Sequence, residues 1–68
     1  MCKQCGIKYL EDKFEDLEEQ IQELEQFLNH EELNTVVATE DVLLMDLQLK
    51  ATCMLQSVIK TRMQRLSN

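Results

Sequence analysis

The stretch that decides the fold is residues 7–28, IKYLEDKFEDLEEQIQELEQFL. Its apolar residues recur at alternating spacings of three and four: Ile7, Leu10, Phe14, Leu17, Ile21, Leu24 and Leu28. A period of 3.5 residues places these side chains in one narrow stripe along a helix, and such a stripe is typical of a surface that packs on another helix. The stretch therefore predicts a helical association module.

The size and composition of the chain limit the folds available to it. With 68 residues, the chain has room for one small domain. Ordering each residue costs about 1.5 kcal/mol, which apolar burial barely offsets at this size. One Gly and no Pro leave helices almost uninterrupted. Since small domains gain stability from disulfides, metals or oligomerisation, this helix-rich composition favours oligomerisation.

The charge is acidic overall and unevenly distributed. The net charge is −6, with −9 on residues 10–32 and +4 on residues 50–68. Nucleic-acid binding needs a basic surface, so we expect no nucleic-acid partner. The polarity instead favours a self-complementary fold or a basic helical segment of another protein as partner.

The cysteine content and the polar first residues indicate the cellular compartment of the protein. An odd number of cysteines without a secretory signal is typical of a reducing compartment, which predicts the cytoplasm or the nucleus. No uninterrupted apolar run approaches the roughly 18 residues of a membrane span, so we expect no membrane partner.

Four segments are predicted along the chain. Residues 1–6 form a flexible or metal-binding N-terminal segment, with Gly6 marking the start of the first helix. The first helix covers 7–28. Residues 29–39 form a connector, in which Asn29 and Glu32 have the spacing of a capping box and indicate a short helical turn. Thr39 is the expected cap of the second helix, 40–66.

The second helix is apolar over a wider arc than the first. On a helical wheel its apolar residues span about 200°, against about 100° for the stripe of the first helix. The members of this arc are Leu43, Leu44, Met45, Leu47, Ala51, Met54, Leu55, Val58, Ile59, Met63 and Leu66. A narrow helix cannot cover an arc this wide, so another surface must bury the remainder.

Two arrangements of the helices are consistent with this pattern. A short connector favours an antiparallel hairpin, and folding about residue 36 brings apolar positions together. The expected pairs are Leu28 with Leu44, Leu24 with Leu47, Ile21 with Ala51, Leu17 with Leu55, and Phe14 with Val58. This arrangement also brings the acids of the first helix near Lys50, Lys60 and Arg62. The alternative is an extended parallel coiled coil through the first helix.

The resulting fold prediction is all-α: an antiparallel two-helix hairpin that assembles as a dimeric four-helix bundle. The expected interface comprises the stripe of the first helix together with Leu44, Leu47, Ala51, Met54, Leu55, Val58 and Ile59 of the second. Val42, Leu49 and Cys53 form a minor apolar strip on the opposite side, which is either a second contact surface or a set of scattered residues without a contact role, and we favour the latter.

Cys2 and Cys5 form the one motif with metal-ligand spacing. Tetrahedral zinc needs four ligands, so two chains would have to contribute one such pair each. A frayed terminus is the simpler interpretation, and we expect no cofactor. His30, the single histidine, has no nucleophile nearby in the sequence, so no catalytic site is predicted. The expected function is a non-enzymatic oligomerisation module of a larger protein, with a zinc-dependent dimer clasp as the alternative.

Overall fold

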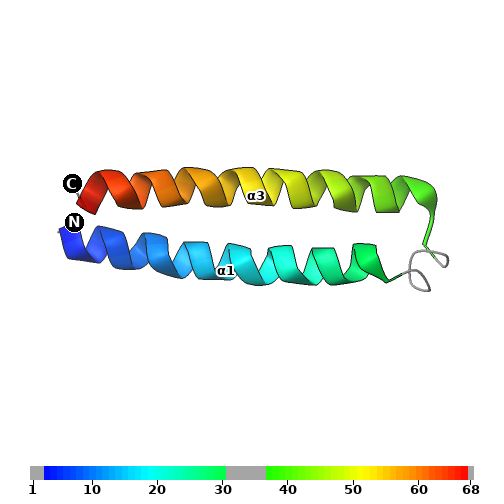
Figure 1. The fold of residues 1–68 in the computed structure, drawn as a ribbon, viewed down its shortest axis with the longest axis horizontal. Coiled ribbons are helices and arrows are strands. Elements are labelled where there is room, and N and C mark those ends of the chain that lie inside the picture. The colour runs from blue at the N-terminus through cyan, green and yellow to red at the C-terminus, as the bar shows by residue number, and fades with distance from the viewer. Residues whose placement is uncertain (1–2, 31–36, 68) are drawn as a thin grey trace.

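The computed structural model describes residues 3–30 and 37–67. They form two helices, α1 (Lys3–Asn29) and α3 (Thr39–Ser67), packed against each other. The helices run antiparallel, so that the start of α1 and the end of α3 lie at the same end of a rod 48 Å long (Figure 1). The prediction of an all-helical chain with two packed helices is confirmed, and the arrangement is the hairpin.

Helix α1 begins earlier than the sequence suggested. It starts at Lys3 rather than at Ile7, and Gly6 lies inside it. Glycine inside a helix costs about 1 kcal/mol relative to alanine, a cost that a long helix tolerates. The prediction that Gly6 marks the helix start is therefore wrong. The helix ends at Asn29, where the backbone N–H of His30 donates to the carbonyl of Phe27 at 3.1 Å.

Helix α3 begins one residue before the predicted start. The carbonyl of Ala38 accepts hydrogen bonds from the N–H groups of Asp41 and Val42, at 3.0 and 3.1 Å. Ala38 thus holds the capping position expected for Thr39, which is the first helical residue. Glu40 and Asp41 lie in the first turn, where acids favour the positive end of the helix dipole. The predicted turn within Asn29–Ala38 falls mostly on residues 31–36, outside the described residues.

The stripe of α1 faces α3. Leu10, Leu17 and Ile21 are buried, with Leu10 only 2 % exposed. Leu10 and Leu17 form a cluster with Ile59 of α3. Phe14, Met63 and Leu66 pack around this cluster. The hydrophobic core therefore lies toward the end of the hairpin that carries the chain termini.

Helix α3 contacts α1 through a different face from the predicted one. Apart from Asp46, its buried and half-buried residues follow spacings of three and four, and we call them the inner face of α3: Val42, Met45, Leu49, Thr52, Gln56, Ile59, Met63 and Leu66. Val42 and Leu49, interpreted above as scattered residues, belong to this contact. That interpretation is wrong for these two, whereas Cys53 is exposed.

The predicted side-chain pairs within the hairpin are wrong for the same reason. Leu44, Leu47, Ala51, Leu55 and Val58, expected opposite the α1 stripe, are exposed. Of the predicted α3 interface residues, Ile59 is the one that lies in the core. The register was nevertheless close. The predicted register places residue 56 opposite residue 16. Gln56 hydrogen-bonds to Phe14 and Glu18, each two positions away from residue 16.

The inner face contains polar side chains, and their hydrogen bonds explain how it can pack against α1. The hydroxyl of buried Thr52 donates to the carbonyl of Gln48 at 2.7 Å. The Nε2 of Gln56 donates to Glu18 Oε2 at 2.6 Å and reaches the carbonyl of Phe14 at 3.5 Å. Because both polar side chains have partners, placing them at the helix contact carries little penalty.

The expected ion pairs between the helices are not formed by the described residues. The two ion pairs there join Lys8 to Asp12 at 3.0 Å and Lys50 to Asp46 at 2.9 Å, each one turn apart within one helix. Lys60 of α3 and Glu11 of α1 line one shallow hollow between the helices, but they form no ion pair. The polar link between the helices is Gln56 with Glu18 instead.

Candidate interaction surface

The side of α3 that faces away from α1 is apolar and exposed. Six large side chains there are between 50 and 71 % exposed, and we call them the outer face of α3: Leu43, Leu44, Leu47, Met54, Leu55 and Val58. Single exposed apolar residues are normal on protein surfaces, but a contiguous group on one helix is typical of an interaction site. The outer face is therefore the candidate functional site.

Four residues of the outer face follow a heptad spacing together with Ala51, which lies between them. Leu44, Leu47, Ala51, Met54 and Val58 follow one another at intervals of three, four, three and four. This spacing gives a continuous stripe that packs best on another helix. Helix α3 thus carries two such stripes on opposite sides, one covered by α1 and one exposed.

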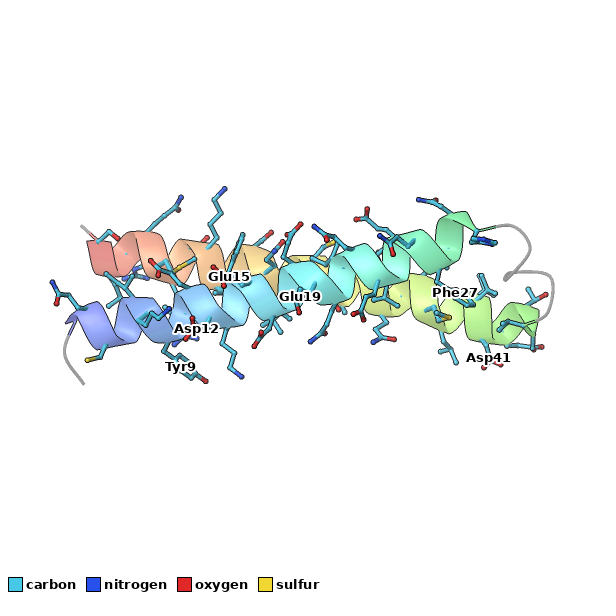
Figure 2. All side chains as sticks on the ribbon, turned by 90° about the horizontal axis from the view of Figure 1, so that it is seen from below. Tyr9, Asp12, Glu15, Glu19, Phe27 and Asp41 are labelled. Carbon is cyan, nitrogen blue, oxygen red and sulfur yellow. The ribbon has the colours of Figure 1, made fainter. Side chains whose placement is uncertain are left out.

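The two ends of the outer face carry opposite charge. Glu40 and Asp41 lie in the first turn of α3, at the connector end of the hairpin, where Figure 2 labels Asp41. Arg62 and Arg65 lie near the other end of the helix and are exposed. The outer face is therefore an apolar stripe with an acidic end and a basic end.

A shallow hollow lies toward the basic end of this face. It has a volume of about 340 Å³ and is lined by Met54, Ser57, Val58, Thr61, Arg62 and Arg65. Met54 and Val58 provide an apolar floor, and the two arginines lie at one end. The hollow can hold an apolar side chain with an acidic group beside it.

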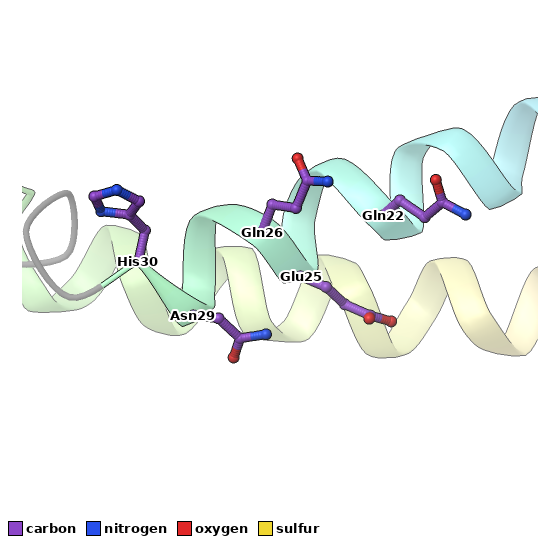
Figure 3. Close-up of a pocket in the computed structure, with 5 residues that line it drawn as sticks. All are labelled: Gln22, Glu25, Gln26, Asn29 and His30. Carbon is purple, nitrogen blue, oxygen red and sulfur yellow. The ribbon is translucent and has the colours of Figure 1, made fainter.

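A larger hollow lies at the end of α1 and shows no sign of a site. It measures about 570 Å³ and lies along Gln22, Glu25, Gln26, Asn29 and His30. Figure 3 shows Gln22, Gln26 and His30 in one row and Glu25 and Asn29 in another. All five side chains are polar and exposed. An open polar surface lacks the enclosure of a ligand site, and none of the described residues that line this hollow is a nucleophile for His30.

The exposed side of α1 is acidic. Figure 2 shows Asp12, Glu15 and Glu19 along the helix and Tyr9 pointing away from α3. The ammonium group of Lys13 lies 5.7 Å from the centre of the Tyr9 ring, within cation–π range. The Lys8 ammonium donates to the Asp12 carboxylate, which raises the pKa of Lys8 above its ordinary value. These contacts lie within α1 and leave its acidic surface solvated.

The predicted zinc ligands are only partly within the described residues. Cys5 lies in the first turns of α1 and is exposed, whereas Cys2 is outside the described part of the chain. Among the residues that are described, no three His, Cys, Asp or Glu side chains gather as metal ligands would. Cys5 itself lies on helix α1.

Helix α3 is also apolar enough to raise the question of a membrane. Averaged over 18 residues, its mean hydropathy reaches 1.3, so by length and composition alone it could span a bilayer. Core helices of soluble proteins share this property. Here only 11 % of those 18 residues are buried in the hairpin.

Sequence reasoning found most of the outer-face residues, but it placed Leu44, Leu47, Leu55 and Val58 against α1, where they do not lie. It missed Thr52 and Gln56, because polar residues are not counted when apolar periodicity is read. The signal that could have found them is the unbroken heptad from Val42 to Leu66, which becomes visible once polar residues with nearby partners are allowed.

Comparison with known proteins gives no family. No family model, no curated protein and no solved structure matches this chain.

Proposed function

We propose that this chain is an oligomerisation module that joins two copies of the protein carrying it. The two hairpins pack through the outer faces of α3 and form a dimeric four-helix bundle. The observation that carries the proposal is the outer face itself, a heptad-spaced apolar stripe of which each large side chain is at least half exposed. The role is structural and non-enzymatic.

The small core of the hairpin supports this proposal. Within residues 3–30 and 37–67, the buried apolar side chains are Leu10, Leu17, Ile21 and Ile59. A core of this size rarely stabilises a domain by more than about 3–5 kcal/mol. Fully burying a Leu, Val or Met side chain contributes about 1.5–3 kcal/mol, so an interface built from two outer faces supplies stability that one hairpin lacks.

Light scattering on a sizing column tests the proposal. We expect the intact chain to have twice the monomer mass at micromolar concentration. The same measurement with zinc and then with chelator separates helix packing from the zinc clasp. Helix packing leaves the mass unchanged, and a clasp through Cys2 and Cys5 loses the dimer on chelation.

A matched pair of variants locates the interface. Leu47→Glu places a charge in the outer face and should reduce the mass to that of a monomer, because an unpaired charge is costly to bury. Tyr9→Glu makes a similar change at a side chain of similar exposure on α1, and should leave the dimer intact. A monomeric wild-type chain, or a dimer that Leu47→Glu does not weaken, would contradict the proposal.

A further inference from the structure

We infer that α3 pairs with α3 of a second copy in antiparallel orientation, about a two-fold axis beside Ala51. The inference rests on the proposed oligomerisation and specifies its partner surface: the outer face binds a second outer face, not a different part of the hairpin. Symmetric dimers use the same patch on both subunits, so the patch must be complementary to itself.

The charges of the outer face are complementary to themselves in one orientation only. Antiparallel pairing brings Glu40 and Asp41 of each copy toward Arg62 and Arg65 of the other, at both ends of the interface. Parallel pairing would bring the two acidic ends together and the two basic ends together, and like charges oppose that orientation.

Reversing the outer face about Ala51 brings four of its apolar side chains opposite one another, whereas Met54 falls opposite Gln48. Ala51 lies midway between Leu44 and Val58, so reversal about Ala51 places these two opposite each other. The same operation places Leu47 opposite Leu55. The small Ala51 side chain at the centre lets the two helices approach closely, with larger side chains on either side.

The hollow on the outer face has the geometry that this pairing needs. Met54, Ser57, Val58 and Thr61 are spaced as i, i+3, i+4 and i+7, the four positions that form one hole in helix packing. Reversal about Ala51 places Leu44 of the second copy over this hole. Its Glu40 and Asp41 then lie toward Arg62 and Arg65, which line the end of the same hollow.

The other surfaces available to the outer face fit it less well. The exposed side of α1 is acidic and would place carboxylates against an apolar stripe. Helices that lie on a membrane carry basic residues along the whole length of their apolar face, whereas the outer face of α3 has its arginines at one end and Glu40 and Asp41 at the other. A second outer face meets both the apolar stripe and the charged ends.

Disulfide trapping in the full-length chain tests the orientation. In a background of Cys2→Ser, Cys5→Ser and Cys53→Ser, one chain carries Leu44→Cys and a second, longer-tagged chain carries Val58→Cys. After mild oxidation we expect the mixed disulfide in at least tenfold excess over either self-linked dimer, because residue 44 faces residue 58 across the axis and not itself. Ala51→Cys alone should self-link, which fixes the register. Circular dichroism and light scattering confirm that each variant is helical and dimeric.

Each outcome separates the orientation from the proposed function. A dimeric mass with self-linked Leu44→Cys means parallel pairing, which overturns this inference and leaves oligomerisation standing. A dimeric mass with no linking at residues 44, 51 or 58 places the interface elsewhere and also overturns it. A helical monomer overturns both proposals. If that monomer co-sediments with phosphatidylserine vesicles, the outer face is a lipid-binding surface.

Discussion

The inner and outer faces of α3 lie on one helix and follow the same heptad spacing, but their compositions differ. The inner face includes Thr52 and Gln56 and packs against α1. The outer face consists of large apolar side chains, and they remain half exposed or more. Within one chain, the less apolar stripe is buried and the more apolar stripe is exposed.

This difference shows which properties decide the face of a helix that packs within a hairpin. A hairpin contact needs matched register and partners for its polar groups, and the inner face meets both needs through Gln56 and Glu18. The apolar content of a surface sets how much free energy its burial releases. Either stripe of α3, however, is wide enough to fill the contact with the narrow apolar stripe of α1. The stripe with the most to gain from burial lies on the side of α3 that faces away from α1.

The largest effect should come from a charge on the inner face. Ile59 is 5 % exposed and packs with Leu10 and Leu17. Ile59→Asp leaves an uncompensated charge in the core, which costs about 3–5 kcal/mol, as much as the whole stability expected at this size. We expect loss of most helical circular dichroism at every protein concentration.

The neighbouring residue on the outer face provides the control. Val58 is half exposed, so Val58→Asp removes no contact within the hairpin core. It should retain much of the helical signal while the melting temperature loses its dependence on concentration, which reports dissociation. If Val58→Asp unfolds the chain as completely as Ile59→Asp, the two faces do not differ as described.

A smaller effect is expected from reversing charge at one end of the outer face. Arg62→Glu combined with Arg65→Glu should weaken dimerisation about tenfold at low salt, since exposed ion pairs contribute about 0–1 kcal/mol each. The loss should shrink as salt is raised. Sedimentation equilibrium at two salt concentrations measures both quantities.

A compensating variant serves as the control for this charge reversal. Adding Glu40→Arg and Asp41→Arg to the reversed chain restores opposite charges across an antiparallel interface, so the dimer should recover. A quadruple variant that stays as weak as the double variant would show that the charged ends do not meet.

The two helices differ in how much of their packing could be predicted from the sequence. The α1 stripe was predictable because α1 has a single apolar period, and its core residues Leu10, Leu17 and Ile21 are buried as expected. The register was also close, because a short connector leaves few ways to fold back. Both properties follow from local spacing.

The contact face of α3 could not be chosen in the same way. Helix α3 carries two heptad patterns, one on the inner face and one on the outer face. When only apolar residues are counted, the pattern on the outer face is the better candidate for the core. The hydrogen bond from Gln56 to Glu18 joins residues 38 positions apart and exists only after the helices have been placed. The helix start at Lys3 was missed because Gly6 was weighted as a stop, although a long helix tolerates one glycine.

The smallest effect tests whether that polar link helps to select the inner face. Gln56 donates to the Glu18 carboxylate at 2.6 Å, but Glu18 is exposed to solvent, which weakens the pair. A double-mutant cycle of Gln56→Ala and Glu18→Ala, measured by urea unfolding at one fixed protein concentration, should give a coupling of about 0.5–1 kcal/mol. The cycle of Gln56→Ala with Glu19→Ala, a neighbour without this hydrogen bond, should give a coupling near zero. Equal coupling in both cycles would mean that a general charge effect, rather than the hydrogen bond, links α3 to α1 at this position, and that shape alone places the inner face.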